Sequence, residues 1–285
     1  MLRRQNLVKY LTVMGGGAPA AAFVGAYDAI ANLVHIYEPA RRVLSAYSGN
    51  LVLLRRASDN AELAFGALAN GDLDVAAIAA WAGGASYVVT VYDQIGSDNI
   101  TQATTANQPL FTASAQNGHA GMTFDGSNDY LQGAYTNGGA LSQPFGVYAV
   151  AKIAAGVING DGNFDIADSD DAINRMILRY NGGATPDNWA INGGAWLQGG
   201  TVDANPRIWS VLFNGASSQF WHNGGSIAAG NAGAHNPDGI TIGAEASASA
   251  CFEGIICTVI IADPAHSDAQ RIAMETAMNS YWNVF

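Results

Sequence analysis

The densest group of side chains that could do chemistry is a run of carboxylates. Residues 164–171 read Phe-Asp-Ile-Ala-Asp-Ser-Asp-Asp, which brings Asp165, Asp168, Asp170 and Asp171 into one short stretch. Ca²⁺ binds several clustered oxygen ligands, so these four residues are a candidate calcium site. Turn formation is the alternative, because Asp side chains accept hydrogen bonds from the backbone two residues further on.

A second group combines aromatic rings with hydrogen-bonding side chains. Sugar-binding sites place aromatic faces beside amide, imidazole or carboxylate groups on exposed loops. Trp196 has a Gly-Gly pair on each side, and we expect it to be exposed. Large aromatic side chains within strands usually lie in a core instead, which is the alternative for Trp209 and Trp221. The candidate glycan-binding residues are Trp189, Trp196, Trp221, His222 and Asn223.

Other kinds of site find no support in the sequence. The five histidines lie far apart and lack the spacing of transition-metal ligands. Gly15-Gly16-Gly17 lacks the preceding strand and the lysine of a phosphate-binding loop. We therefore expect no cofactor, with calcium as the one possible ligand.

The elements that must position these residues are mostly strands. Asn-Gly and Gly-Gly turns recur through residues 86–265 and predict a β-sandwich core there. Residues 26–85 form a lead-in with short helices, one of them behind Pro39, where Val43, Leu44 and Tyr47 follow at helical spacing. A capping box from Ser267 to Gln270 opens a C-terminal helix over residues 267–282.

One hairpin identifies the type of sandwich. Residues 124–131 read Phe-Asp-Gly-Ser-Asn-Asp-Tyr-Leu, which supplies the residues of a tight reversal between two β-favouring runs. This stretch, followed in order by Arg207–Gly215, Gln219–Gly224 and Ile242–Gly254, resembles the concanavalin A-like or laminin G-like jelly rolls. The resemblance covers residues 110–285 and implies a mostly β, concanavalin A-like jelly-roll sandwich.

The stretch before this hairpin carries a second resemblance. Residues 37–111 are similar to the opening of the α-L-arabinofuranosidase B catalytic domain, through Ser45–Gly49, Leu54–Asn60 and Val91–Gln94. That family continues Tyr-Asp-Gln with Ser-Gly-Asn-Gly, whereas this chain reads Ile-Gly-Ser-Asp-Asn over residues 95–99.

The arabinofuranosidase resemblance implies a pair of catalytic carboxylates. Its acid follows Ile-Gly-Gly, and Glu245 stands at that place after Ile242-Gly243-Ala244. Its nucleophilic Glu corresponds to the acidic run, where Asp168 or Asp170 has to serve because no Glu is present. The family's adjacent cysteine pair is absent. Two carboxylates flanking a glycosidic bond are what glycoside hydrolysis requires.

Charge divides the chain into two parts. Residues 1–56 carry seven basic and two acidic side chains, whereas the rest carries five basic and 21 acidic ones. The acidic body disfavours nucleic acid and anionic membranes as partners. Residues 1–25 read as an attachment arm, in which Arg3, Arg4 and Lys9 could dock on an acidic partner; residues 26–285 are then the jelly-roll domain.

The combination of an arabinofuranosidase-like opening with a laminin G-like body resembles bacteriophage virion proteins. It implies a non-enzymatic structural protein on the virion surface, such as a decoration, spike or fibre subunit. Its partners would be other virion subunits, copies of itself and host surface polysaccharide. Two alternatives stay open: a secreted arabinofuranosidase-like glycoside hydrolase, and a purely structural capsid cement protein.

The two cysteines do not form a disulfide framework. Cys251 and Cys257 are separated by strand-like sequence, which holds them too far apart to bond, and their even spacing predicts two small core residues on one sheet face. No stretch of the sequence is long and apolar enough to span a membrane.

Overall fold

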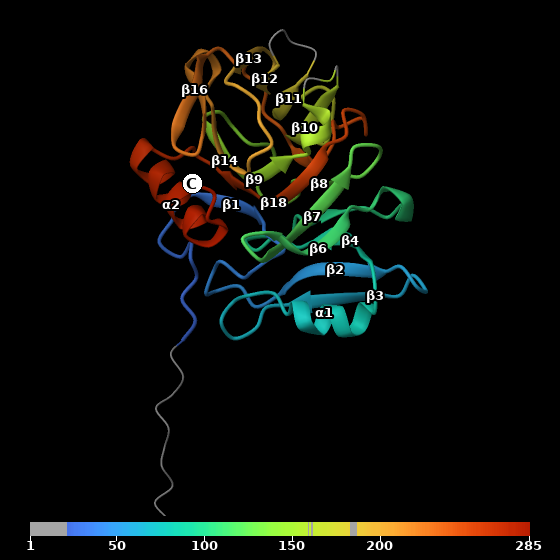
Figure 1. Ribbon diagram of the computed structural model, residues 1–285. Coiled ribbons are helices and arrows are strands. Elements are labelled where there is room, and N and C mark those ends of the chain that lie inside the picture. Colours follow the sequence, from blue (N-terminus) through green and yellow to red (C-terminus); the bar gives the residue numbers. More distant parts are fainter. Residues whose placement is uncertain (1–21, 159, 161, 183–186) are drawn as a thin grey trace, which may run out of the picture.

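The computed structural model describes residues 22–158, 160, 162–182 and 187–285 (Figure 1). Most of the predicted attachment arm, including Arg3, Arg4 and Lys9, lies outside the described residues. The described chain is built mainly of antiparallel strands with two α-helices, so the prediction of a mostly β sandwich with a C-terminal helix is confirmed.

The strands form two layers that share one edge. The first layer runs β16 (Gly225–Gly230), β15 (Ser218–His222), β14 (Arg207–Phe213), β9 (Phe145–Ile153), β18 (Glu253–Ala262), β7 (His119–Asp125) and β6 (Leu110–Gln116). The second runs β13 (Trp196–Gly199), β12 (Asn188–Asn192), β11 (Ile177–Asn181), β10 (Asn163–Asp168), β17 (Gly239–Ile242), β8 (Leu131–Ala134) and β5 (Ile100–Thr101).

Both layers meet at β4 (Ser86–Val91), which pairs with β5 and β6. Beyond it, β2 (Asn50–Arg56) and β3 (Glu62–Gly66) complete that end of the sheet, and β1 (Leu33–Tyr37) pairs with the second half of β18. Three short 3₁₀ turns lie in connections: η1 (Thr105–Asn107), η2 (Ala155–Val157) and η3 (Gly215–Ser217).

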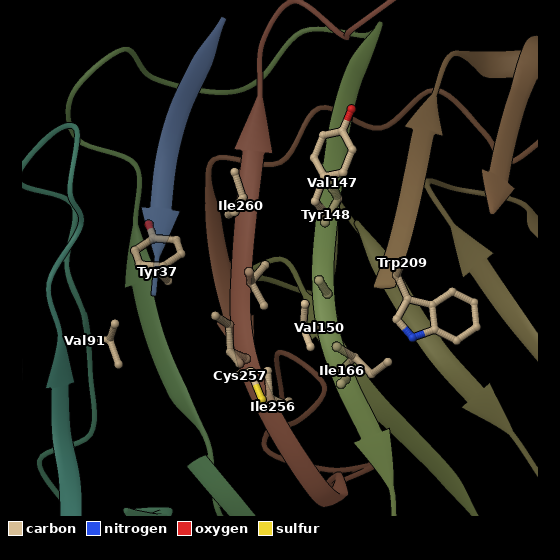
Figure 2. Close-up of a cluster of buried hydrophobic side chains, with 14 of the residues drawn as sticks. Tyr37, Val91, Val147, Tyr148, Val150, Ile166, Trp209, Ile256, Cys257 and Ile260 are labelled. Carbon is tan, nitrogen blue, oxygen red and sulfur yellow. The ribbon is translucent and has the colours of Figure 1, made fainter. Parts of the chain in front are cut away.

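The core fills the space between the layers. Figure 2 shows Val150 of β9, Ile256 and Ile260 of β18, and Trp209 of β14 among its buried side chains. Full burial of an aliphatic or aromatic side chain stabilises the fold by roughly 1.5–3 kcal/mol. Cys257 belongs to this core, whereas Cys251 precedes β18; both thiols are buried and free.

Each α-helix begins at a side-chain cap, and the cap of the C-terminal helix is the one predicted from the sequence. Asp74 caps α1 (Val75–Ala82) by accepting from the Ala77 N–H, and α2 (Asp268–Trp282) opens with the Ser267 capping box. Figure 1 shows α1 against β3 at one end of the molecule and α2 beside β14. Among the described residues, neither helix has the length and apolar character needed to cross a membrane.

The helix expected behind Pro39 is absent. The side chain of Gln94 binds this backbone instead: its Oε1 accepts from the Val43 N–H, and its Nε2 donates to the carbonyls of Glu38 and Arg41. These bonds replace those of a helical turn, so the segment leading to β2 is irregular. The Tyr-Asp-Gln block of residues 92–94 is thus a structural brace.

Candidate functional site

Two carboxylates from different elements converge at one arginine. Asp168 is the last residue of β10, and Glu245 lies in the connection between β17 and β18. Arg175 Nη2 lies 2.6 Å from Asp168 Oδ2 and 2.7 Å from Glu245 Oε1. The two carboxylate oxygens therefore lie at most about 5.3 Å apart, the sum of these two distances.

The Asp168 carboxylate is buried and fixed by several donors. Its Oδ1 accepts from the Ser169 N–H at 2.8 Å and from Arg175 Nε at 3.1 Å, and its Oδ2 accepts from the Ala246 N–H at 3.1 Å. The Ala246 contact ties Asp168 directly to the loop that carries Glu245.

Glu245 is the more accessible of the pair, with 24% of its side chain exposed. Burial alone would raise its pKa, but the Ser249 hydroxyl and the Arg175 guanidinium together hold the pKa below its usual value. The Glu245 N–H donates to the Ser249 carbonyl, which closes the loop tightly.

Gly243 explains how this loop leaves β17. Its φ of +88° is one that glycine adopts readily, and a Cβ there would lie 2.1 Å from the Phe124 ring. The Gly243 N–H donates to Ile166 of β10, and its carbonyl accepts from the Phe252 N–H. The Ile-Gly pair thus aims Glu245 toward the end of β10.

A second ion pair and an exposed indole extend the site. Arg179 of β11 makes a bidentate contact with the buried Asp165, at 2.5 and 2.8 Å. Its guanidinium also lies 5.0 Å from the ring centroid of Trp196, which is 47% exposed, as expected from its glycine-rich surroundings. The backbone N–H of Arg175 donates to His235 Nδ1 at 3.1 Å, which fixes the backbone at this residue.

The four candidate calcium ligands do not share one centre. Asp165 and Asp168 bind different arginines, and Asp171 Oδ1 accepts from the Ile173 and Asn174 N–H groups in an Asx turn. The Asp170 side chain packs against Gly239, where burial and the charge of Asp238 raise its pKa. In the described part of the chain, no three His, Cys, Asp or Glu side chains are placed to hold a metal. Asp170 is likewise separate from the Asp168–Glu245 pair.

Three candidate glycan residues lie away from Trp196 in different surroundings. Trp189 is only 2% exposed, and its ring packs 4.4 Å from that of Trp209 in the core. His222 Nδ1 pairs with Arg207 Nη1 at 2.9 Å, and Asn223 forms the turn after β15, where its Oδ1 accepts from the Ile208 N–H. These contacts give all three a structural role.

Arg175 and Arg179 were not predicted from the sequence. One signal was available: only five basic residues follow residue 56, and these two stand four positions apart directly after the acidic run. Basic side chains so placed in an acidic body are expected to pair with its carboxylates.

Comparison with known proteins gives the fold. No family model matches the chain, and no curated protein matches it by sequence. Two solved structures each match 89% of this chain. One is a GH54 α-L-arabinofuranosidase soaked with a cyclic sulfate inhibitor (TM-score 0.68, 16% identity), and the other is an arabinofuranosidase complexed with arabinofuranosyl-α-1,2-xylobiose (TM-score 0.72, 16% identity). The chain spans 64% of the length of each. The botulinum neurotoxin serotype D binding domain is a more distant match (TM-score 0.51, 10% identity).

This comparison corrects the function predicted from the sequence. The expected non-enzymatic phage virion protein is overturned, because the solved structures with TM-scores of 0.68 to 0.72 are arabinofuranosidases and no finding supports a phage virion. The glycoside hydrolase alternative is the better supported one. At 15–16% identity the likeness shows a shared β-sandwich fold, so any activity has to be argued from the site itself.

Proposed function

We propose that this protein is an arabinofuranosidase-like glycoside hydrolase that uses Asp168 and Glu245. The observation that carries the proposal is the convergence of these two carboxylates, with oxygens at most about 5.3 Å apart. Retaining glycosidases place their two carboxyl groups about 5–5.5 Å apart, whereas inverting enzymes leave room for a water between them.

The surroundings assign the two roles. Asp168, buried and fixed by three donors, is the nucleophile that attacks the anomeric carbon and forms a glycosyl-enzyme. Glu245, at the more open side, first donates a proton to the leaving oxygen and then takes one from the water that releases the sugar. Trp196 offers an aromatic face beside them for the substrate.

Arg175 is a positioning residue in this scheme. It lies between the carboxylates and favours the charged form of Glu245, so it has to withdraw from Glu245 before that residue can donate its proton. A substrate that enters between the two carboxylates displaces the Arg175 side chain, because the sugar occupies the place of the guanidinium.

The test is hydrolysis of arabinofuranosyl-α-1,2-xylobiose, whose leaving oxygen has to be protonated, by the wild-type chain and two isosteric variants. Asp168→Asn and Glu245→Gln each remove one ionisable group while keeping the shape, and we expect each to lower kcat/KM by roughly 10²–10⁴-fold. Asp171→Asn, in the neighbouring turn, is the matched control and should retain activity. Equal rates for all four proteins would contradict the proposal.

A second function, sugar binding without cleavage, is favoured by one observation. The depressed pKa of Glu245 leaves little protonated acid at neutral pH. A wild-type chain that binds arabinofuranosides in calorimetry, loses binding on Trp196→Ala, and shows no turnover between pH 4 and 7 would establish this function instead.

A further inference from the structure

Two cavities adjoin on the outer side of the first layer, away from the carboxylate pair. One has a volume of about 570 Å³ and the other about 480 Å³. Thr123 and Asp125 line both, so the cavities form one trough. Neither is lined by Asp168, Glu245 or Trp196.

The floor of the trough is a row of directly paired residues on six neighbouring strands. In order across the sheet these are Arg55, Tyr87, Leu110, Thr123, Ile255 and Lys152. Direct partners in a sheet point to the same face, and strands lie about 4.8 Å apart, so the row spans about 24 Å. The trough therefore suits an extended ligand that crosses the strands.

One buried acid in the trough lacks a full set of partners. Asp129 is 6% exposed and lines the larger cavity. Its Oδ2 accepts from the Asp125 N–H at 3.1 Å, whereas its Oδ1 has no hydrogen-bond partner within the described part of the chain. Because Asp129 lines the cavity and this oxygen is not used by the described residues, it is suited to accept a hydrogen bond from a ligand.

The charges around the trough exclude an anionic ligand. The Arg55 guanidinium is engaged in hydrogen bonds within the protein: its Nε, Nη1 and Nη2 donate to Gln108, Asn60 and the Thr105 carbonyl. The remaining ionisable groups that line the trough are Asp125, Asp129, Glu253 and Lys152, and burial beside Asp125 raises the pKa of Asp129 to about 7. Three carboxyl groups against one ammonium favour a ligand that donates hydrogen bonds and carries no negative charge.

We propose that this trough binds a chain of neutral sugar residues. Sugar hydroxyls donate to Asp129 and Asp125, the apolar ring faces lie on Leu110 and Ile255, and the chain runs across the strands from Arg55 toward Lys152. The trough is a second carbohydrate site, distinct from the Asp168–Glu245 pair. It does not depend on cleavage, and a protein without hydrolase activity would still bind through it.

The test is affinity electrophoresis in gels containing a soluble polysaccharide. The neutral probes are arabinoxylan, linear arabinan and xyloglucan, and the anionic probe is polygalacturonate. All proteins carry Glu245→Gln, so that turnover does not alter the polymer. Retardation by at least one neutral polymer and none by polygalacturonate is expected.

Two variants on different elements address the trough. Ala106→Trp fills the larger cavity from an exposed position, and Asp129→Asn replaces the acceptor by an isosteric amide. Each should raise the dissociation constant at least tenfold. Ala80→Trp, on the exposed face of α1, is the matched control and should bind as the parent does. Thermal melting verifies that every variant is folded.

Three results overturn the proposal. The first is that no neutral polymer retards the parent protein. The second is that Ala106→Trp and Asp129→Asn bind as tightly as Ala80→Trp. The third is that binding is lost on Trp196→Ala but not on Ala106→Trp, which would place the glycan at the carboxylate pair alone. Failure of the proposed hydrolase activity would leave these results unchanged.

Discussion

Arg175 bridges Asp168 and Glu245, and together with the Ser249 hydroxyl it keeps the pKa of Glu245 below its usual value. A guanidinium within 2.7 Å of Glu245 favours the charged carboxylate, and so does the Ser249 hydroxyl. The acid form needed for catalysis therefore becomes abundant only below the ordinary pKa range of a glutamic acid. For the proposed hydrolase this means that kcat/KM rises as the pH falls from neutral toward acid.

Replacing Arg175 should move that pH dependence. Arg175→Gln removes the positive charge, so the pKa of Glu245 rises, and the descending limb of the kcat/KM profile should shift to higher pH. The measurement is a pH profile with arabinofuranosyl-α-1,2-xylobiose, with Arg207→Gln as a remote control. A profile that keeps its midpoint would show that Arg175 does not act on the catalytic acid.

Residue types could be foreseen from the sequence better than their partners. Motif resemblance predicted Glu245 as the acid with Asp168 or Asp170 as its partner, and Trp196 was expected to be exposed because of its flanking glycines. Arg175 was not foreseen, because its contact with both carboxylates depends on how β10, β17 and the loop before β11 come together. No local sequence pattern predicts a contact that depends on the packing of separate elements.

At the scale of elements, the loop from Gly243 to Phe252 serves both proposed sites. Glu245 faces Asp168, while the loop's end leads into Glu253 at the trough. The helices and most turns of the fold were predictable, because caps and turn residues act locally. The failed helix behind Pro39 shows the opposite case, since Gln94, distant in sequence, takes over its backbone hydrogen bonds.

Gly243→Ala should lower the free energy of unfolding by more than the backbone strain at a positive φ accounts for. The added Cβ meets the Phe124 ring, so we expect a loss of about 2–4 kcal/mol in the free energy of unfolding, together with reduced activity. Gly138→Ala is the matched control, because its φ is also positive but its Cβ meets nothing within 4 Å. It should cost about 1–2 kcal/mol. Equal losses in urea denaturation would contradict the role given to Phe124.

At the scale of the whole molecule, the end of α2 joins segments that are far apart in sequence. The Tyr281 ring stacks 3.6 Å from His119 and lies 3.8 Å from the Arg41 guanidinium. Its hydroxyl donates to the Ala40 carbonyl at 3.4 Å and to Asp72 at 3.3 Å. Together with the sharing of β4 by both layers, this contact should make unfolding cooperative.

Tyr281→Ala should therefore destabilise the described fold as one unit. We expect a loss of about 2–4 kcal/mol, because a packed ring and its cation–π contact disappear. Tyr281→Phe keeps the ring and should lose only about 0.5–1.5 kcal/mol. Tryptophan fluorescence and far-UV circular dichroism should give one coincident transition for each protein; separate transitions would mean that the lead-in unfolds independently.

The two free thiols can report local opening and global unfolding separately. Cys251 lies in the loop that carries Glu245, whereas Cys257 is sealed between the layers, and burial raises the pKa of both thiols. A thiol reagent can reach Cys251 through a local opening of that loop, but it reaches Cys257 only when the sandwich itself comes apart. The ratio of the two labelling rates therefore measures how much more freely the Glu245 loop opens than the whole protein unfolds, without any introduced probe.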